Sequence, residues 1–267
     1  MKIKLVAADC DGTLINSEGI LTPRTERAVR ECLANDILFV MATGRPTFGV
    51  KWFADMFEED LPLITYNGSA VTMSRSGTVI FTDMLSAELC SELIALGRER
   101  GAGIVTYADG RMYIAERSYL TDKYAEFYNL DPTACDIAPI IKNGATKILW
   151  FDDPKIIRSY YSDIQLHFGL RLNCFLSAPY MFEFVSPESS KGLALEILGK
   201  KLNIKPEEMM AIGDGFNDVS MLEYAGIGVA VANAAQGVKD MANAVTLSND
   251  DDGAAAAIEK YVLEDKF

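Results

Sequence analysis

The 267-residue sequence contains a single histidine, His167, and only five cysteines. A Ser-His-Asp or Cys-His mechanism would depend on this one histidine, which we expect to be an ordinary residue of a partly buried helix. The cysteines are odd in number, widely spaced and without a Cys-x-x-Cys pair, which argues against a disulfide framework and a zinc cluster. We expect reduced, mostly buried thiols, and chemistry based on carboxylates, lysine, hydroxyls or a metal ion.

Long hydrophobic runs and basic charge are also scarce. No window approaches the roughly 18 to 20 uninterrupted apolar residues of a membrane-spanning helix. The largely apolar stretch from Ile3 to Ala8, which includes Lys4, meets Asp9 at once, too early for the core of a signal peptide. The 25 basic residues face 38 acidic ones, a formal net charge of −13, so the chain should repel polyanions. We expect a cytoplasmic protein with no nucleic-acid or membrane partner.

Apolar residues make up 49% of the chain, enough for a sizeable core. The two ends of the sequence alternate strand and helix patterns, which predicts an α/β fold with a doubly wound parallel sheet. We expect a helix that begins at Thr22-Pro23 and ends near Asn35, a second helix after Ser190, and a final helix over 253–263. Buried strands are predicted over 2–8, 37–42, 61–66, 209–212, 227–231 and 244–247.

The middle of the chain has a different texture. Between about Leu85 and Glu183 aromatic residues become frequent, and short strand-like runs such as Thr146 to Phe151 alternate with helical ones. We therefore predict a discontinuous core domain formed by residues 1–84 and 185–267, with an α+β domain of residues 85–184 inserted between its halves.

Four polar loops follow predicted strands or open a predicted helix. In an open parallel sheet such loops can converge beyond the carboxyl ends of the strands, where ligands bind. Carboxylates gathered there repel one another, and a hard divalent cation such as Mg²⁺ would hold them ionised. Glycines and helix starts let backbone N–H groups approach an anion, so the combination predicts phosphoryl transfer. The loops are Asp9-Cys10-Asp11-Gly12-Thr13, Thr43-Gly44-Arg45, Ser190-Lys191-Gly192 and Gly213-Asp214-Gly215-Phe216-Asn217-Asp218.

In this order the loops resemble the four motifs of the haloacid dehalogenase (HAD) superfamily, with Lys191 as the third motif. The insert lies between the second and third motifs, which is similar to the Cof-type subfamily with its α+β cap of the C2B type. Tyr66-Asn67-Gly68 before the insert is also similar to a Cof-type signature. The resemblance implies a Rossmann-like HAD core and a cap that selects the substrate and excludes water from the site.

The resemblance also implies a role for each motif residue. Asp9 would attack phosphorus and form an aspartyl-phosphate, and Asp11 would protonate the leaving oxygen and later deprotonate the attacking water. Cys10 departs from the larger apolar residue that is more usual there, and the neighbouring carboxylates should suppress its thiolate. The implied phosphate-binding groups are the Cys10 backbone N–H, Thr43, Gly44, Lys191 and Asn217, and the implied Mg²⁺ site consists of Asp9, the Asp11 carbonyl, Asp214 and Asp218.

The implied function is Mg²⁺-dependent hydrolysis of a small phosphorylated metabolite, such as a sugar phosphate or a cofactor phosphate. A phosphotransferase or phosphomutase of the same superfamily is an alternative, which stoichiometric release of phosphate would exclude. A catalytically idle binding protein is a second alternative, although every expected catalytic residue is present. A phosphorylation-dependent signalling module also combines acidic residues, threonine and lysine on a doubly wound sheet, but it would be smaller and would lack the insert.

Overall fold

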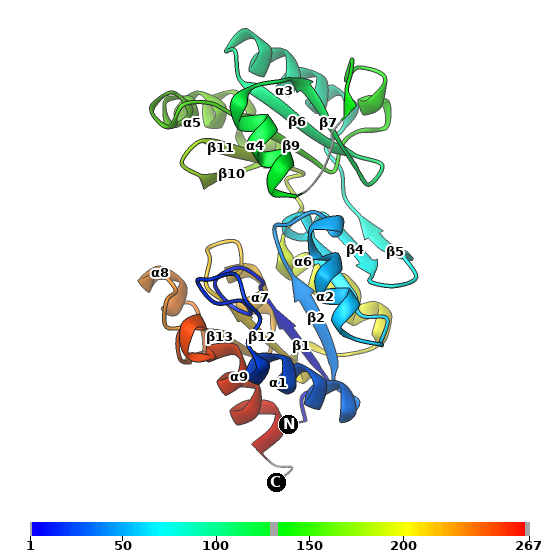
Figure 1. The fold of residues 1–267 in the computed structure, drawn as a ribbon, viewed down its shortest axis with the longest axis vertical. Helices are drawn as coiled ribbons and strands as arrows, with labels where there is room; N and C mark the ends of the chain where they lie inside the picture. The colour runs from blue at the N-terminus through cyan, green and yellow to red at the C-terminus, as the bar shows by residue number, and fades with distance from the viewer. Residues whose placement is uncertain (1, 129–132, 265–267) are drawn as a thin grey trace. The chain divides into compact units, whose positions relative to one another are not determined.

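The computed structural model describes residues 2–128 and 133–264, and the chain forms two compact units (Figure 1). One unit combines Met1–Phe81 with Ser190–Phe267, and the other consists of Thr82–Ser189. Each unit has a hydrophobic core of its own. Within the described ranges, no helix has both the length and the apolar composition needed to cross a membrane.

The first unit is built on an eight-stranded sheet with the order β14-β13-β12-β1-β2-β3-β4-β5. Every neighbouring pair from β14 to β3 is parallel, and β4 runs antiparallel to β3. The strands extend over Leu5–Ala8 (β1), Leu38–Ala42 (β2), Pro62–Thr65 (β3), Ala70–Met73 (β4), Val79–Thr82 (β5), Met209–Gly213 (β12), Ile227–Ala230 (β13) and Ala244–Val245 (β14).

Helices cover both faces of this sheet, which confirms the predicted doubly wound α/β class. Helix α1 packs against α9 on one face and α6 packs against α7 on the other (Figure 1). The predicted start of α1 is confirmed, because the Thr22 side chain caps the helix and Pro23 is its first residue. The helices are Pro23–Ala34 (α1), Lys51–Met56 (α2), Lys191–Leu202 (α6), Val219–Tyr224 (α7), Gln236–Lys239 (α8) and Gly253–Ile258 (α9), the last continued by a π-helical turn over Glu259–Leu263.

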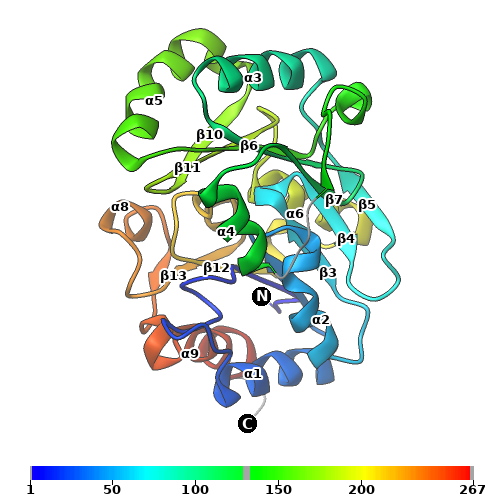
Figure 2. The same cartoon turned by 45° about the horizontal axis from the view of Figure 1, so that its top comes forward.

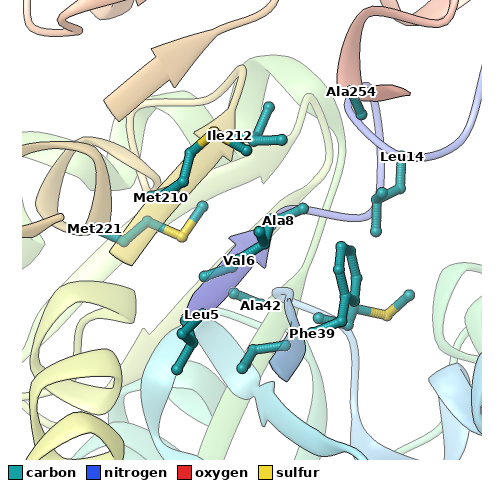
Figure 3. Close-up of a cluster of buried hydrophobic side chains, with 14 of the residues drawn as sticks. Leu5, Val6, Ala8, Leu14, Phe39, Ala42, Met210, Ile212, Met221 and Ala254 are labelled. Atoms are coloured by element: carbon teal, nitrogen blue, oxygen red, sulfur yellow. The ribbon is translucent and has the colours of Figure 1, made fainter. Parts of the chain in front are cut away.

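The central strands of the first unit are buried on both faces, as their continuous apolar sequences predict. Figure 3 shows Leu5, Val6 and Ala8 of β1 beside side chains from β2 and β12. Leu14 and Ala254 belong to the same core from outside the sheet. This packing fixes the carboxyl ends of β1, β2 and β12 side by side, and the polar loops begin at those ends.

The strands β4 and β5 were not predicted. The chain reverses direction after β3 through a turn in which Tyr66, Asn67 and Gly68 have φ values of 54°, 58° and 103°. An Asn-Gly pair after an apolar run is a hairpin signal, but β5 is largely exposed and lacks the burial pattern of a core strand. Hydrophobic periodicity therefore detects the parallel centre of the sheet and misses this edge.

The second unit is an α+β structure built on a six-stranded sheet with the order β10-β11-β9-β6-β7-β8. Its pairs are antiparallel except β7 with β8. Figure 2 shows α3 and α5 along one side of the sheet and α4 along the other. The elements are Ala87–Glu99 (α3), Gly103–Ala108 (β6), Arg111–Glu116 (β7), Tyr119–Phe127 (α4), Thr133–Ala134 (β8), Lys147–Phe151 (β9), Pro154–Phe168 (α5), Asn173–Ala178 (β10) and Met181–Val185 (β11).

The scarce residue types take ordinary structural positions. His167 lies on α5, where its Nε2 is 2.8 Å from Oε1 of Glu92. All five cysteines are free thiols, and Cys10, Cys32 and Cys90 are buried. The expectation that most of the cysteines are buried is confirmed.

Candidate active site

The candidate site lies where polar loops leave the carboxyl ends of three adjacent parallel strands. Strands β12, β1 and β2 are neighbours in the sheet, so the loops that follow them emerge at the same edge. Helix α6 contributes its first residue, Lys191, to this edge. The structure therefore brings together loops that lie about 200 residues apart in sequence, as the contact between Thr13 and Asp214 shows.

Lys191 is the central cation of the site. It is fully buried, and its Nζ lies 2.5 Å from Oδ1 of Asp9 and 2.5 Å from Oδ1 of Asp218. Burial alone would lower the pKa of Lys191, but the charges of Asp218 and Asp9 outweigh that effect and raise the pKa. Lys191 is therefore a buried ammonium group that joins the loop after β1 to the loop after β12.

Asp218 organises the loop after β12. Its Oδ2 accepts hydrogen bonds from the backbone N–H groups of Asp214 and Gly215, at 3.0 and 2.9 Å, and its Oδ1 accepts from Lys191. Such charge-assisted bonds stabilise a buried carboxylate. They also hold Asp214 in place, and Oδ1 of Asp214 accepts a 3.0 Å hydrogen bond from the Thr13 hydroxyl.

The carboxylates of Asp9, Asp214 and Asp218 form a compact acidic cluster, with one oxygen of each within 4.8 Å of the others. Burial raises the pKa of Asp9, the Lys191 charge opposes this rise, and the two other carboxylates add to it. Burial and the Asp218 charge also raise the pKa of Asp214. The Lys191 charge offsets the mutual repulsion of these carboxylates only in part. Such a cluster of oxygen ligands suits a hard divalent cation such as Mg²⁺.

The Asp11 side chain does not join the acidic cluster. It is 55% exposed and forms a two-point ion pair with Arg45, in which Nη2 lies 2.5 Å from Oδ1 and Nε lies 2.7 Å from Oδ2. The resemblance implies that Asp11 would bind the metal through its backbone carbonyl, and the position of the side chain does not test that expectation. Asp9 and Asp11, two residues apart, therefore have different cationic partners.

The loop after β2 is held by the turn that follows β3. Thr43 is buried, and its carbonyl accepts a 3.0 Å hydrogen bond from the backbone N–H of Asn67. The Asn67 side-chain oxygen accepts a 3.0 Å hydrogen bond from the Asn217 amide. A Cβ atom added at Gly44 would collide with the Asn67 side chain. Asn67 therefore links the predicted phosphate-binding residues Thr43, Gly44 and Asn217.

Sequence reasoning assigned no role to Asn67. The signal that could have identified it is the Asn67-Gly68 pair at the end of a buried strand, because Asn and Gly readily adopt the positive φ values found there. Its contact with Asn217 spans 150 residues of sequence and depends on the fold.

Cys10 is a buried thiol between the two aspartates of the first loop. Burial is the main cause that raises its pKa, and the charges of Asp11 and Asp9 raise it further. The neighbouring carboxylates therefore act on the thiol pKa in the predicted direction, and burial is the larger cause. The Cys10 side chain therefore packs in this loop as a small apolar group.

Comparisons with known proteins agree with this geometry. Residues 6–258 match the haloacid dehalogenase-like hydrolase family. The chain belongs to this family. YxeH of Bacillus subtilis is 32% identical over 272 residues, covering 97% of this chain and 98% of that protein. Phosphatase YwpJ of the same organism is 30% identical over 280 residues, covering 95% and 98% of the two chains.

Solved structures of the family share the fold over nearly the whole chain. A haloacid dehalogenase-like hydrolase from Bacteroides thetaiotaomicron has a TM-score of 0.88 and 31% identity, covering 97% of this chain and 99% of that one. The predicted membership in the HAD superfamily and the predicted hydrolase class are confirmed. The roles of the individual site residues remain predictions.

Proposed function

We propose that this protein is a Mg²⁺-dependent phosphatase that hydrolyses a small phosphorylated metabolite, such as a sugar phosphate or a cofactor phosphate, through an aspartyl-phosphate on Asp9. The observation that carries this proposal is the buried contact of Asp9 with Lys191, inside the acidic cluster and beside the exposed carboxylate of Asp11. A nucleophile that must react with a phosphate dianion needs such a nearby cation to offset the repulsion.

The metal would be held by oxygen ligands of the core loops. The Asp9 and Asp214 carboxylates and the Asp11 carbonyl are the proposed ligands, while Asp218, whose two oxygens accept N–H hydrogen bonds, supports the site. Bound Mg²⁺ supplies charge neutralisation and polarisation of the phosphoryl oxygens.

The proposed reaction has two steps. In the first, an Asp9 carboxylate oxygen forms a bond to phosphorus, the bond from phosphorus to the leaving oxygen breaks, and Asp11 gives that oxygen a proton. In the second, water attacks the phosphorus of the aspartyl-phosphate, Asp11 accepts a proton from the water, and the bond to Asp9 breaks with release of inorganic phosphate. The exposure of the Asp11 side chain supports this role, because a proton shuttle needs access to the leaving group and to water.

The other predicted residues would bind the transferring phosphoryl group. The proposed donors are the Cys10 and Gly44 backbone N–H groups, the Thr43 hydroxyl, the Asn217 amide and the Lys191 ammonium group. Thr43 and Asn217 are both tied to Asn67, which supports a preorganised set of donors. We assign the unit Thr82–Ser189 the role of a substrate-selecting cap, and we place the protein in the cytoplasm.

The test measures phosphate release from a panel of sugar phosphates, nucleotides and cofactor phosphates, with Mg²⁺ or with EDTA. We expect release with Mg²⁺ only, and none from Asp9→Asn. The matched control is Asp55→Asn, which changes an exposed aspartate of α2 paired with Lys51 and should keep full activity. Equal release from the wild type and Asp9→Asn would contradict the proposal. Dephosphorylated product in excess over free phosphate would indicate a phosphotransferase instead.

A further inference from the structure

Arg45 is the cationic partner of Asp11, and sequence reasoning gave it no catalytic task. Its Nε and Nη2 atoms contact the two different oxygens of the Asp11 carboxylate, at 2.7 and 2.5 Å. Two parallel N–H contacts of this kind fix the orientation of a carboxylate as well as its position. The ion pair joins the loop after β1 to the loop after β2.

Arg45 is itself anchored at several points. Its backbone N–H donates a 3.1 Å hydrogen bond to the Thr43 hydroxyl, and its carbonyl accepts a 3.0 Å hydrogen bond from the N–H of Tyr66. Its Nη1 lies 3.5 Å from the carbonyl oxygen of Gly49. The Arg45 side chain is only 18% exposed, whereas the Asp11 side chain is 55% exposed. The arginine is therefore the fixed partner and the aspartate the accessible one.

The two aspartates of the first loop are consequently held apart by two different cations. Asp9 is buried and contacts Lys191, while Asp11 is turned toward Arg45 on the exposed side of the loop. Arg45 is the side-chain hydrogen-bond partner of the Asp11 carboxylate in the described part of the chain. Without it, the Asp11 side chain could take other rotamers. A proton shuttle that is poorly oriented toward the leaving oxygen loses much of its rate advantage.

We propose that Arg45 is a positioning residue for Asp11, holding its carboxylate where it can protonate the leaving group. This inference rests on the proposed function. In the first step one Asp11 oxygen carries the proton and passes it to the leaving oxygen, while the other oxygen stays on Arg45. Because Arg45 acts through Asp11, its contribution to the rate should be larger for a leaving group that needs a proton than for one that does not.

The test compares two substrates of nearly the same shape, phenyl phosphate and p-nitrophenyl phosphate. Nitrophenolate leaves readily without a proton, whereas phenolate needs one. The ratio kcat/KM covers only the steps up to departure of the leaving group. We expect Arg45→Met to lower kcat/KM for phenyl phosphate on the order of 10-fold more than for p-nitrophenyl phosphate, within the range of acid–base contributions. Arg27→Met, at an exposed position of α1, is the control and should change neither value.

Two further variants separate positioning from simple attraction of the substrate. Arg45→Lys keeps the charge and loses the two-point contact, so it should retain the selective defect on phenyl phosphate. In an Asp11→Asn background, Arg45→Met should cause no further loss on phenyl phosphate, because the group that it positions is gone.

Equal losses on both substrates, full recovery in Arg45→Lys, or additive losses in the double variant would overturn the inference and make Arg45 a substrate-binding residue. These outcomes all require an active wild type, so they are distinct from failure of the proposed function. If the wild type released no phosphate from any substrate, the proposed function and the inference would fall together.

Discussion

Gly68 packs against the backbone carbonyl of Ser190, and there is no room for a Cβ atom between them. Ser190 caps α6, whose first residue is Lys191, so this contact sets the place where the buried cation enters the site. Gly68 also has a φ of 103°, which L-residues rarely adopt. The close approach therefore connects the turn after β3 to the position of Lys191.

Gly68→Ala should destabilise the protein and impair activity, because either Ser190 or the turn must move. We expect a loss of unfolding free energy of about 1–3 kcal/mol from the steric overlap alone. The control is Gly77→Ala, which also has a positive φ, 68°, but no atom within 4 Å of an added Cβ. Urea unfolding of both variants isolates the steric part. Equal losses in the two variants would show that backbone strain alone is responsible.

Lys191→Met should abolish activity and should also strongly destabilise the folded protein. The change leaves the buried carboxylates of Asp9 and Asp218 without their shared cation, and removal of one partner of a buried ion pair costs about 3–5 kcal/mol. Urea unfolding measures the loss. Lys200→Met, at an exposed position of the same helix, is the control and should change stability little. Wild-type stability in Lys191→Met would contradict the central role of this cation.

A second buried ion pair lies in the unit Thr82–Ser189. Lys147 and Glu183 are almost fully buried on the neighbouring strands β9 and β11, with Nζ 3.0 Å from Oε2. Lys147→Met should reduce the unfolding free energy by about 3–5 kcal/mol, because it removes the cation that pairs with the buried Glu183 carboxylate. The double variant Lys147→Met with Glu183→Leu should regain most of that loss. A double variant that is as unstable as the sum of the single changes would show that the two charges act independently.

The parallel centre of the sheet was predictable because its strands are continuous apolar runs, and the site followed from polar loops at their ends. Asp9, Lys191, Asp214 and Asp218 could be assigned to one edge in this way. The pairing of Arg45 with Asp11 and the link from Asn67 to Asn217 were not predictable. These contacts depend on rotamers and loop conformations that only the folded chain defines.

Mg²⁺ should bind to the acidic cluster and stabilise the folded protein even without substrate. A cation among Asp9, Asp214 and Asp218 relieves the repulsion of carboxylates held within 4.8 Å of one another. A ligand that binds only the folded state stabilises it by about 2.7 kcal/mol at 100 times its dissociation constant. Thermal unfolding in Mg²⁺ against EDTA should therefore show a higher midpoint with the metal.

Asp214→Asn should lose most of this Mg²⁺-dependent rise, because it removes a charged oxygen ligand from the cluster. Asp163→Asn, an exposed aspartate of α5, is the control and should keep the wild-type response to the metal. The two variants carry the same change of charge, so a nonspecific salt effect would act on them equally. A full Mg²⁺ response in Asp214→Asn would place the metal away from this residue. No Mg²⁺ response in the wild type would argue against a preformed metal site.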